Sequence, residues 1–185
     1  MAVPGDPGPA PQVDLQPTLI GPQLTLRPLC ADDLQPLYDV ARDPQLWALH
    51  PEPDRWQRPV FEQLFAACLR SGGALAVVHT ASGRVIGSST FYDWDADKAE
   101  VVIGYTYLAR DHWGGAANRE LKRLMLQHAY GFARQVWFHV GMNNLRSRRA
   151  MEKIGASLSH AVVIPNAAGV PRDMVVYVMR PPQLP

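Results

Sequence analysis

The chain has 185 residues, of which 47% are hydrophobic and 19% charged, a balance typical of globular rather than disordered proteins. This length favours a single domain. The formal net charge of +1 provides no broad basic surface, so composition argues against a nucleic-acid scaffold and against a protein that binds anionic membranes.

The N-terminal residues 1–17 are rich in proline and glycine and predict a disordered tail ahead of one domain over residues 18–185. They lack the basic start and apolar run of a secretory signal, and no apolar stretch approaches the roughly 18 residues that span a bilayer. Cys30 and Cys68 lie far apart, which suggests neither a disulfide framework nor a zinc cluster. We expect a cytoplasmic protein without a membrane partner.

The first half of the domain predicts strands and helices in alternation. Residues 24–29 alternate like a strand, and the next apolar positions have helical spacing up to Arg42. A proline-punctuated stretch over 43–58 has no regular pattern and is expected to border a pocket. A helix that ends at Gly72 and Gly73 follows, and then come three strand-like runs at 74–80, 84–93 and 100–108, which predict an antiparallel meander.

The second half predicts a long helix over roughly Ala117–Arg134, with His128 packed in its apolar stripe. A strand at 136–140, a short helix closed by Gly155 and a hairpin of 158–165 with 174–180 follow. The strand–helix–strand connection should make its two strands parallel. The expected fold class is α+β, with a mixed, mostly antiparallel sheet whose central parallel strand pair is flanked by helices.

Small residues precede the long helix. A backbone without Cβ atoms can approach a ligand closely, and the first turn of a helix has unpaired N–H groups at a positive dipole end. Gly114, Gly115 and Ala116, directly before Ala117, therefore predict a cradle for a pyrophosphate, unless they only allow tight packing of helix and sheet. The nucleotide-hydrolase motif is absent, and the lack of a dinucleotide fingerprint makes an NAD-dependent oxidoreductase a distant alternative.

The second half of the chain carries a family resemblance. The strand "IGYTYL", the loop "WGGAA", a long helix, a strand, and then N-x-x-S with "EKIG" resemble the GNAT superfamily of N-acetyltransferases, in particular its RimJ/RimL-like branch. The similarity covers roughly Gly21 to Arg180. It implies acetyl-CoA bound in a V-shaped gap between residues 103–108 and 136–140, where pantetheine can pair with the backbone like an added strand.

The resemblance also implies cofactor-binding residues. The family's Gln/Arg-x-x-Gly-x-Gly/Ala motif corresponds to residues 111–116, but Asp111 stands where glutamine or arginine is usual, so either it points away or Arg110 replaces it. Asn144 is expected either to contact pantetheine or to cap a helix. Arg146, Arg148 and Arg149 either meet the 3′-phosphate of CoA or form a solvated face. The implied binding residues are Tyr107, Leu108, Arg110, Trp113, Gly114, Gly115, Ala116, Ala117, Asn118, Asn144, Ser147 and Arg148.

The implied reaction is direct attack of an amine on the thioester, which requires a base, a group that polarises the carbonyl and an acid for the leaving thiolate. Many relatives use a tyrosine acid at the position of Met151, so that acid is excluded here. Ser147 is the predicted acid, or else caps a helix. Glu100, or in second place Asp93, is the predicted base, and a strand bulge near Gly104 is expected to polarise the carbonyl.

The functional hypotheses differ in class. The first is transfer of an acetyl group to a primary amine, either a protein or peptide N-terminus or a small amine, and the second is a non-catalytic CoA-binding or protein-interaction module. A homodimer through the terminal hairpin is a further expectation. The "DWDAD" stretch fails as a calcium loop because Lys98 and Gly104 occupy its sixth and twelfth positions, and no metal is predicted. Four aromatic residues and a histidine are expected either to border the acceptor or to pack in the core: Trp47, His50, Trp56, Trp94 and Tyr105.

Overall fold

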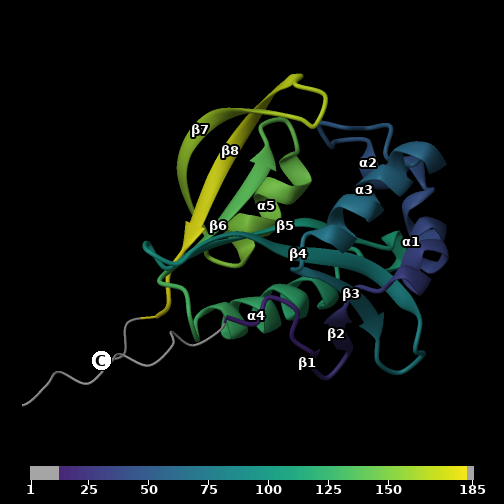
Figure 1. The fold of residues 1–185 in the computed structure, drawn as a ribbon, viewed down its shortest axis with the longest axis horizontal. Helices are drawn as coiled ribbons and strands as arrows, with labels where there is room; N and C mark the ends of the chain where they lie inside the picture. Colours follow the sequence, from purple (N-terminus) through teal and green to yellow (C-terminus); the bar gives the residue numbers. More distant parts are fainter. Residues whose placement is uncertain (1–12, 183–185) are drawn as a thin grey trace, which may run out of the picture.

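The computed structural model describes residues 13–182. Within this part of the chain the strands form one sheet in the order β1-β2-β3-β4-β5-β6-β8-β7 (Figure 1). Every neighbouring pair is antiparallel except β5 with β6, which confirms the predicted mixed sheet and central parallel pair. The strands are β1 (Leu19–Ile20), β2 (Leu24–Pro28), β3 (Ala74–His79), β4 (Val85–Asp95), β5 (Glu100–Leu108), β6 (Gln135–Gly141), β7 (Ser157–Pro165) and β8 (Pro171–Met179).

Helices cover the sheet on both faces. One apolar cluster lies between the sheet and α4, and a second joins β3 to α1 and α3. Strand alternation explains the division, because Leu75 and Val77 of β3 belong to the first cluster while Ala74 and Ala76 belong to the second. The helices are α1 (Leu34–Ala41), α2 (Pro44–Trp47), α3 (Arg58–Arg70), α4 (Ala117–Ala129) and α5 (Leu145–Lys153).

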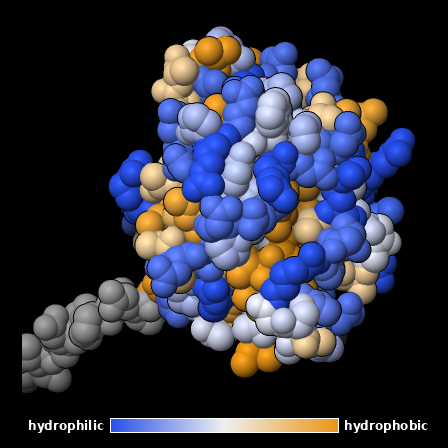
Figure 2. Space-filling view, turned by 90° about the vertical axis from the view of Figure 1, so that its right-hand side faces the viewer, coloured by the Kyte–Doolittle hydropathy of each residue, from blue (hydrophilic) through white to orange (hydrophobic). Residues whose placement is uncertain are grey.

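The surface on the side of α1, α2 and α3 is largely hydrophilic, with hydrophobic residues interspersed (Figure 2). None of the helices in residues 13–182 combines the length and the apolar character that a membrane crossing requires.

Helix α4 is shorter than the sequence predicts. It ends at Ala129 instead of Arg134, because Gly131 is a poor helix former and the chain then turns back to the sheet. Phe132 packs edge-on against Trp94, with ring centroids 5.1 Å apart, and the backbone N–H of Arg134 donates to Ala99. His128 packs against Phe91 and Phe132, as predicted.

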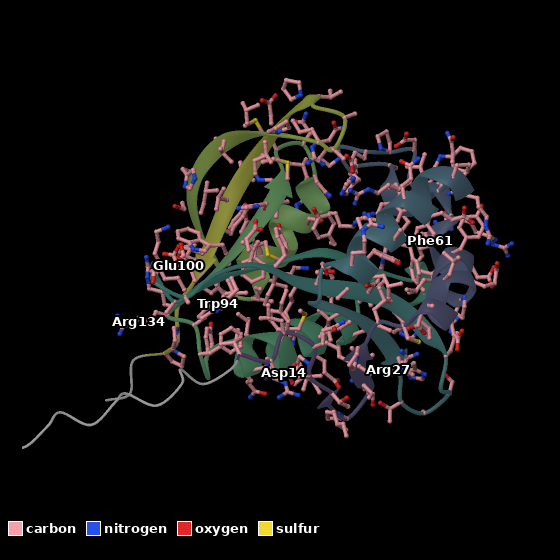
Figure 3. The ribbon with its side chains drawn as sticks, viewed as in Figure 1. Asp14, Arg27, Phe61, Trp94, Glu100 and Arg134 are labelled. Carbon is pink, nitrogen blue, oxygen red and sulfur yellow. The ribbon has the colours of Figure 1, made fainter. Side chains whose placement is uncertain are left out.

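Part of the predicted disordered tail belongs to the folded domain. Residues 1–12 lie outside the described residues, whereas residues 13–17 pack on the domain (Figure 3). Leu15 packs against the first apolar cluster, His128 Nε2 donates to the carbonyl of Asp14 at 2.7 Å, and Gln16 Nε2 donates to the carbonyl of Ala74 at 3.1 Å. These contacts compensate for ordering a proline-rich segment, so the prediction is wrong for residues 13–17.

The parallel pair β5–β6 is very short. Its register runs only from Glu100 opposite Gln135 to Val102 opposite Trp137. Beyond these residues β5 continues beside β4, and β6 continues beside β8 as far as Gly141. The sheet therefore opens into two halves, as the two diverging ribbons in Figure 1 show.

Candidate functional site

A cleft occupies the opening between β5 and β6. Its walls are residues 103–106 of β5 and 138–141 of β6, and Asn118 and Lys122 of α4 also line it. Helix α5 contributes Ser147, Ala150 and Met151, with Asn144 at its start. At the other end lie His50 and Arg55, from the irregular stretch predicted to border a pocket, and the hairpin residues 164–167, Arg172 and Met174.

A bulge interrupts β5 at the cleft. Ser88 pairs with Tyr107 and Thr90 with Gly104, so Tyr105 and Thr106 together face the single residue Ser89. Tyr105 has a φ of 51°, in the left-handed region. A bulge leaves ladder groups unpaired and re-aims the backbone. The bulge predicted near Gly104 is thus present, and its residues Tyr105 and Thr106 line the cleft.

The loop before α4 is open toward solvent. Gly114 has a φ of +71°, which favours glycine, and a Cβ added at Gly114 or Gly115 would meet nothing within 4 Å. Tight packing therefore does not explain these glycines. Ala116 provides no side-chain cap for α4, so the first-turn N–H groups of the helix are available to a ligand. Asn118, in this first turn, lines the cleft.

Neighbouring side chains hold this loop in place. Trp113 Nε1 donates to the carbonyl of Leu108 at 2.9 Å, and the Arg146 guanidinium lies 3.9 Å from the centre of the Trp113 ring. Arg146 also donates to the carbonyl of Leu46 at 2.8 Å, which connects α5 to α2.

Asp111, which departs from the family motif, forms an ion pair with Arg84. Its carboxylate accepts a hydrogen bond from Arg84, which lowers the pKa of Asp111 and offsets its charge beside the loop. Arg110, the other predicted solution, forms an ion pair with Asp43 and does not line the cleft.

Asn144 and Ser147 lie together in the cleft, as expected. Asn144 is 5% exposed, and its Oδ1 accepts from the Ser147 backbone N–H at 3.2 Å, so it caps α5. This cap uses the oxygen of the amide and leaves the Nδ2 donors outside it. The two predicted roles of Asn144 are therefore compatible. The cap involves the backbone of Ser147 and not its hydroxyl.

Glu100 does not meet Ser147. It is the first residue of β5, where the strands are still paired, and its Oε1 accepts from Gln135 Nε2 at 2.7 Å. Figure 3 shows it at the edge of the molecule near Trp94 and Arg134. The structure therefore removes Glu100 from the candidate site. Asp93, the second predicted base, does line the cleft.

Several predicted binding residues point elsewhere. The ring of Tyr107 packs 5.3 Å from that of Trp47, and Leu108 is buried in the first apolar cluster, so only their backbones are available. Arg148 donates to Tyr177 Oη at 3.3 Å and to the carbonyl of Met142 at 3.1 Å, which anchors α5 to the sheet. Of the predicted acceptor residues, His50 and Tyr105 line the cleft.

Lys122 is a cleft residue that the sequence analysis missed. It is 3% exposed, and its Nζ lies 5.3 Å from the centre of the Phe138 ring. Burial lowers the pKa of Lys122 to about 7. The sequence does contain a signal for this residue. Lys122 follows Leu121 and interrupts the otherwise apolar buried face of α4, four residues after Asn118.

Comparisons with known proteins agree with this architecture. Residues 23–157 match the family model described as an acetyltransferase (GNAT) domain. A GCN5-related N-acetyltransferase from Brucella melitensis is 22% identical, with a TM-score of 0.78 over 93% of this chain and 80% of that one. No curated protein sequence matches the chain.

Two further structures share the fold. One is a provisionally assigned ribosomal-protein-serine acetyltransferase from Vibrio cholerae, 15% identical, with a TM-score of 0.75 over 89% of this chain and 97% of that one. The other is the Microcin C7 self immunity acetyltransferase MccE in complex with acetyl-CoA and AMP, 15% identical, with a TM-score of 0.72 over 91% and 99%. Because the family model covers most of the chain and the fold agrees, the protein belongs to the GNAT acetyltransferase domain family.

Proposed function

We propose that the protein transfers the acetyl group of acetyl-CoA to a primary amine by direct attack in a ternary complex. The observation that carries this proposal is the end of β5–β6 pairing at Val102 and Trp137, which opens the cleft. The placement in the RimJ/RimL-like branch is part of the same proposal and rests on the sequence motifs alone.

The described residues fit acetyl-CoA as a substrate. The diverging backbones of β5 and β6 offer hydrogen-bonding groups to the amides of pantetheine, as an edge strand does for a peptide. The uncapped first turn of α4, behind the open Gly114 and Gly115, suits the diphosphate. MccE, which shares the fold, was solved with acetyl-CoA bound.

The chemistry needs two proton transfers and one stabilised oxyanion. Asp93 accepts a proton from the acceptor amine, directly or through water, while the amine nitrogen forms a bond to the acetyl carbon. Backbone N–H groups at the bulge of Tyr105 and Thr106 stabilise the negative oxygen that develops. As the carbon–sulfur bond breaks, the Ser147 hydroxyl gives its proton to the leaving thiolate. Solvent then reprotonates the serine and takes up the proton held by Asp93.

The main competing function is a CoA-binding module without catalysis. Two sequence features favour it: Met151 stands where many relatives have a tyrosine acid, and Asp111 places a carboxylate in the pyrophosphate motif. The ion pair of Asp111 with Arg84 removes the second reason. The acceptor is a primary amine, which can belong to a protein or peptide N-terminus or to a small molecule.

Thermal shift and thiol release test this proposal together. Acetyl-CoA should raise the melting temperature, because it binds the folded state only, and free thiol should appear when an amine acceptor is added. NAD serves as the control nucleotide. Unchanged melting at saturating acetyl-CoA would refute the proposal, and stabilisation without thiol release across a panel of peptides and amines would favour the non-catalytic module.

A further inference from the structure

The end of the cleft formed by residues 50–55 and the β7–β8 hairpin carries an unusual group of charges. Glu52 forms ion pairs with both Arg55 and Arg172, and the latter has an Nη1 to Oε1 distance of 3.1 Å. These bonds connect the loop between α2 and α3 to the hairpin, whose tip reaches that loop in Figure 1. Both arginines line the cleft, and Arg55 is only 7% exposed.

The positive charge at this end exceeds the negative charge. One carboxylate, Glu52, is shared by two guanidinium groups, and guanidinium stays protonated in proteins. Among the cleft-lining residues Arg55 and Arg172 are cations, Lys122 is only partly protonated at pH 7 because its pKa is about 7, and Asp93 is the carboxylate. A buried excess of positive charge is costly unless an anion compensates for it.

His50 leaves one neighbouring donor without an acceptor. Burial, together with the charge of Arg55, lowers the pKa of His50 to about 3, so the ring is neutral at pH 7 and has one acceptor nitrogen. Its Nδ1 lies 2.9 Å from the Glu52 backbone N–H, and its Nε2 lies 3.2 Å from Arg55 Nη1. A neutral ring can accept from only one of these two donors.

Arg172 also has an unused donor. Its Nε is buried and has no hydrogen-bond partner within residues 13–182. Buried N–H groups are nearly always paired, and an unpaired one on a charged side chain is especially unfavourable. Arg55 and Arg172, which both line the cleft, thus offer guanidinium donors that an oxyanion there would satisfy.

We propose that Arg55 and Arg172 bind an anionic oxygen group, a carboxylate or a phosphate, on the acceptor amine. This inference rests on the proposed function and narrows its acceptor. The acceptor is a small molecule that carries both a primary amine and an oxyanion, and its amine extends toward Asp93. A protein N-terminus without a nearby acidic group leaves these donors unsatisfied and is therefore a poor acceptor.

Matched amines test the inference on the wild-type protein. The pairs are β-alanine with β-alaninamide, and O-phosphoethanolamine with ethanolamine, each assayed for thiol release at saturating acetyl-CoA. We expect kcat/KM to be at least about tenfold higher for the anionic member of one pair, since charge-assisted bonds are the stronger ones. A preference within the β-alanine pair identifies the bound group as a carboxylate, and a preference within the O-phosphoethanolamine pair identifies it as a phosphate. Ratios near one in both pairs overturn the inference but leave the proposed function intact.

Variants assign the preference to the two arginines. R55Q and R172Q should bring the anionic-to-neutral ratio close to one, with the KM for acetyl-CoA unchanged. R180Q is the matched control, because Arg180 donates to Gln135 at the paired end of β6. Melting temperatures with and without acetyl-CoA check folding, and R172M replaces R172Q if the latter does not fold. A preference that survives in both arginine variants overturns the assignment.

Complete absence of acetyl transfer would instead defeat the proposed function. Calorimetry on the acetyl-CoA-saturated protein then decides the inference separately. Tighter binding of β-alanine or O-phosphoethanolamine than of its neutral counterpart supports the anion site, and equal or undetectable binding overturns it.

Discussion

Lys122 donates a 2.8 Å hydrogen bond from Nζ to Thr106 Oγ1, across the opening between α4 and the bulged strand β5. Thr106 in turn lies 2.7 Å from the hydroxyl of Ser89, so the ammonium group is bonded to neutral hydroxyls. An ammonium group that is 3% exposed and bonded in this way is poorly compensated for its lost hydration.

This relationship predicts a pH-dependent stability. The pKa of Lys122 is about 7 in the folded state and near its usual 10.5 in the unfolded state. Between these values the unfolded chain binds more protons, so stability should rise with pH from about 7 to 10, whereas below pH 7 the burial penalty is complete. K122M should stabilise the protein by about 1–4 kcal/mol at pH 7 and remove this rise.

Urea unfolding at pH 6, 7, 8 and 9 measures this effect. K153M is the control, because Lys153 is an exposed lysine near the end of α5. A wild-type stability that stays flat between pH 7 and 9, or a K122M protein less stable than wild type at pH 7, would contradict the burial argument.

The loop at Gly114 and Gly115 predicts that a substitution can weaken acetyl-CoA binding without lowering the stability of the protein. A methyl group at Gly115 meets no protein atom within 4 Å, so G115A should leave the free protein's unfolding free energy within about 0.5 kcal/mol of wild type. If the loop holds the diphosphate, the same methyl group obstructs it and the Kd for acetyl-CoA rises. G114A is the comparison, because its φ of +71° should cost about 1 kcal/mol of stability. Unchanged acetyl-CoA affinity in G115A would remove the loop from the binding site.

Ser147 is expected to contribute to kcat and not to folding. Its backbone N–H donates to Asn144 Oδ1 whether or not the hydroxyl is present, so S147A should keep its melting temperature. Loss of a general acid should lower kcat by about 10²-fold or more, with the KM for acetyl-CoA little changed. Steady-state thiol release measures both constants. A kcat within twofold of wild type means that another group, or water, protonates the thiolate.

Asn144 allows its two roles to be separated. N144D retains the oxygen that caps α5 but loses the amide donors, whereas N144A loses both. Only N144A should lose about 1 kcal/mol of stability, while both should bind acetyl-CoA more weakly if the amide contacts pantetheine. Calorimetric titration and denaturant unfolding of the two variants provide the comparison. Wild-type affinity in N144D would reduce Asn144 to a structural cap.

Arg84 is expected to protect the cofactor loop from the charge of Asp111. The pair is exposed and adds little to stability, so R84Q should fold normally. It should nevertheless raise the KM for acetyl-CoA, more at low salt than at high salt, because the carboxylate then repels the diphosphate. The double variant R84Q/D111N should recover the wild-type KM. A double variant as impaired as R84Q would show that Arg84 acts without Asp111.

Sequence patterns predict this fold best where local periodicity determines the structure. The meander β3–β4–β5 and the parallel β5–β6 pair were predicted from alternation and connection length. Helix α2 was missed because it spans only Pro44–Trp47, with Asp43 as its cap, and no amphipathic pattern fits in four residues. Glu100 was misassigned because alternation does not reveal at which end a strand pair opens.

The charged end of the cleft could not be predicted from the sequence, for a different reason. Arg55 and Arg172 are far apart in the sequence and become neighbours only through Glu52, where a loop meets a hairpin. No local pattern encodes that contact, and one sequence contains no record of which distant residues lie together.

The short β5–β6 ladder affects which amino-acid substitutions the cleft can tolerate. A substrate arm that completes the gap, as proposed, would bond to main-chain amides and carbonyls, which every residue type except proline supplies alike. Side chains along the opening can therefore change without closing it. The Brucella melitensis structure shows that this architecture persists at 22% identity, so the path of the backbone tolerates extensive substitution.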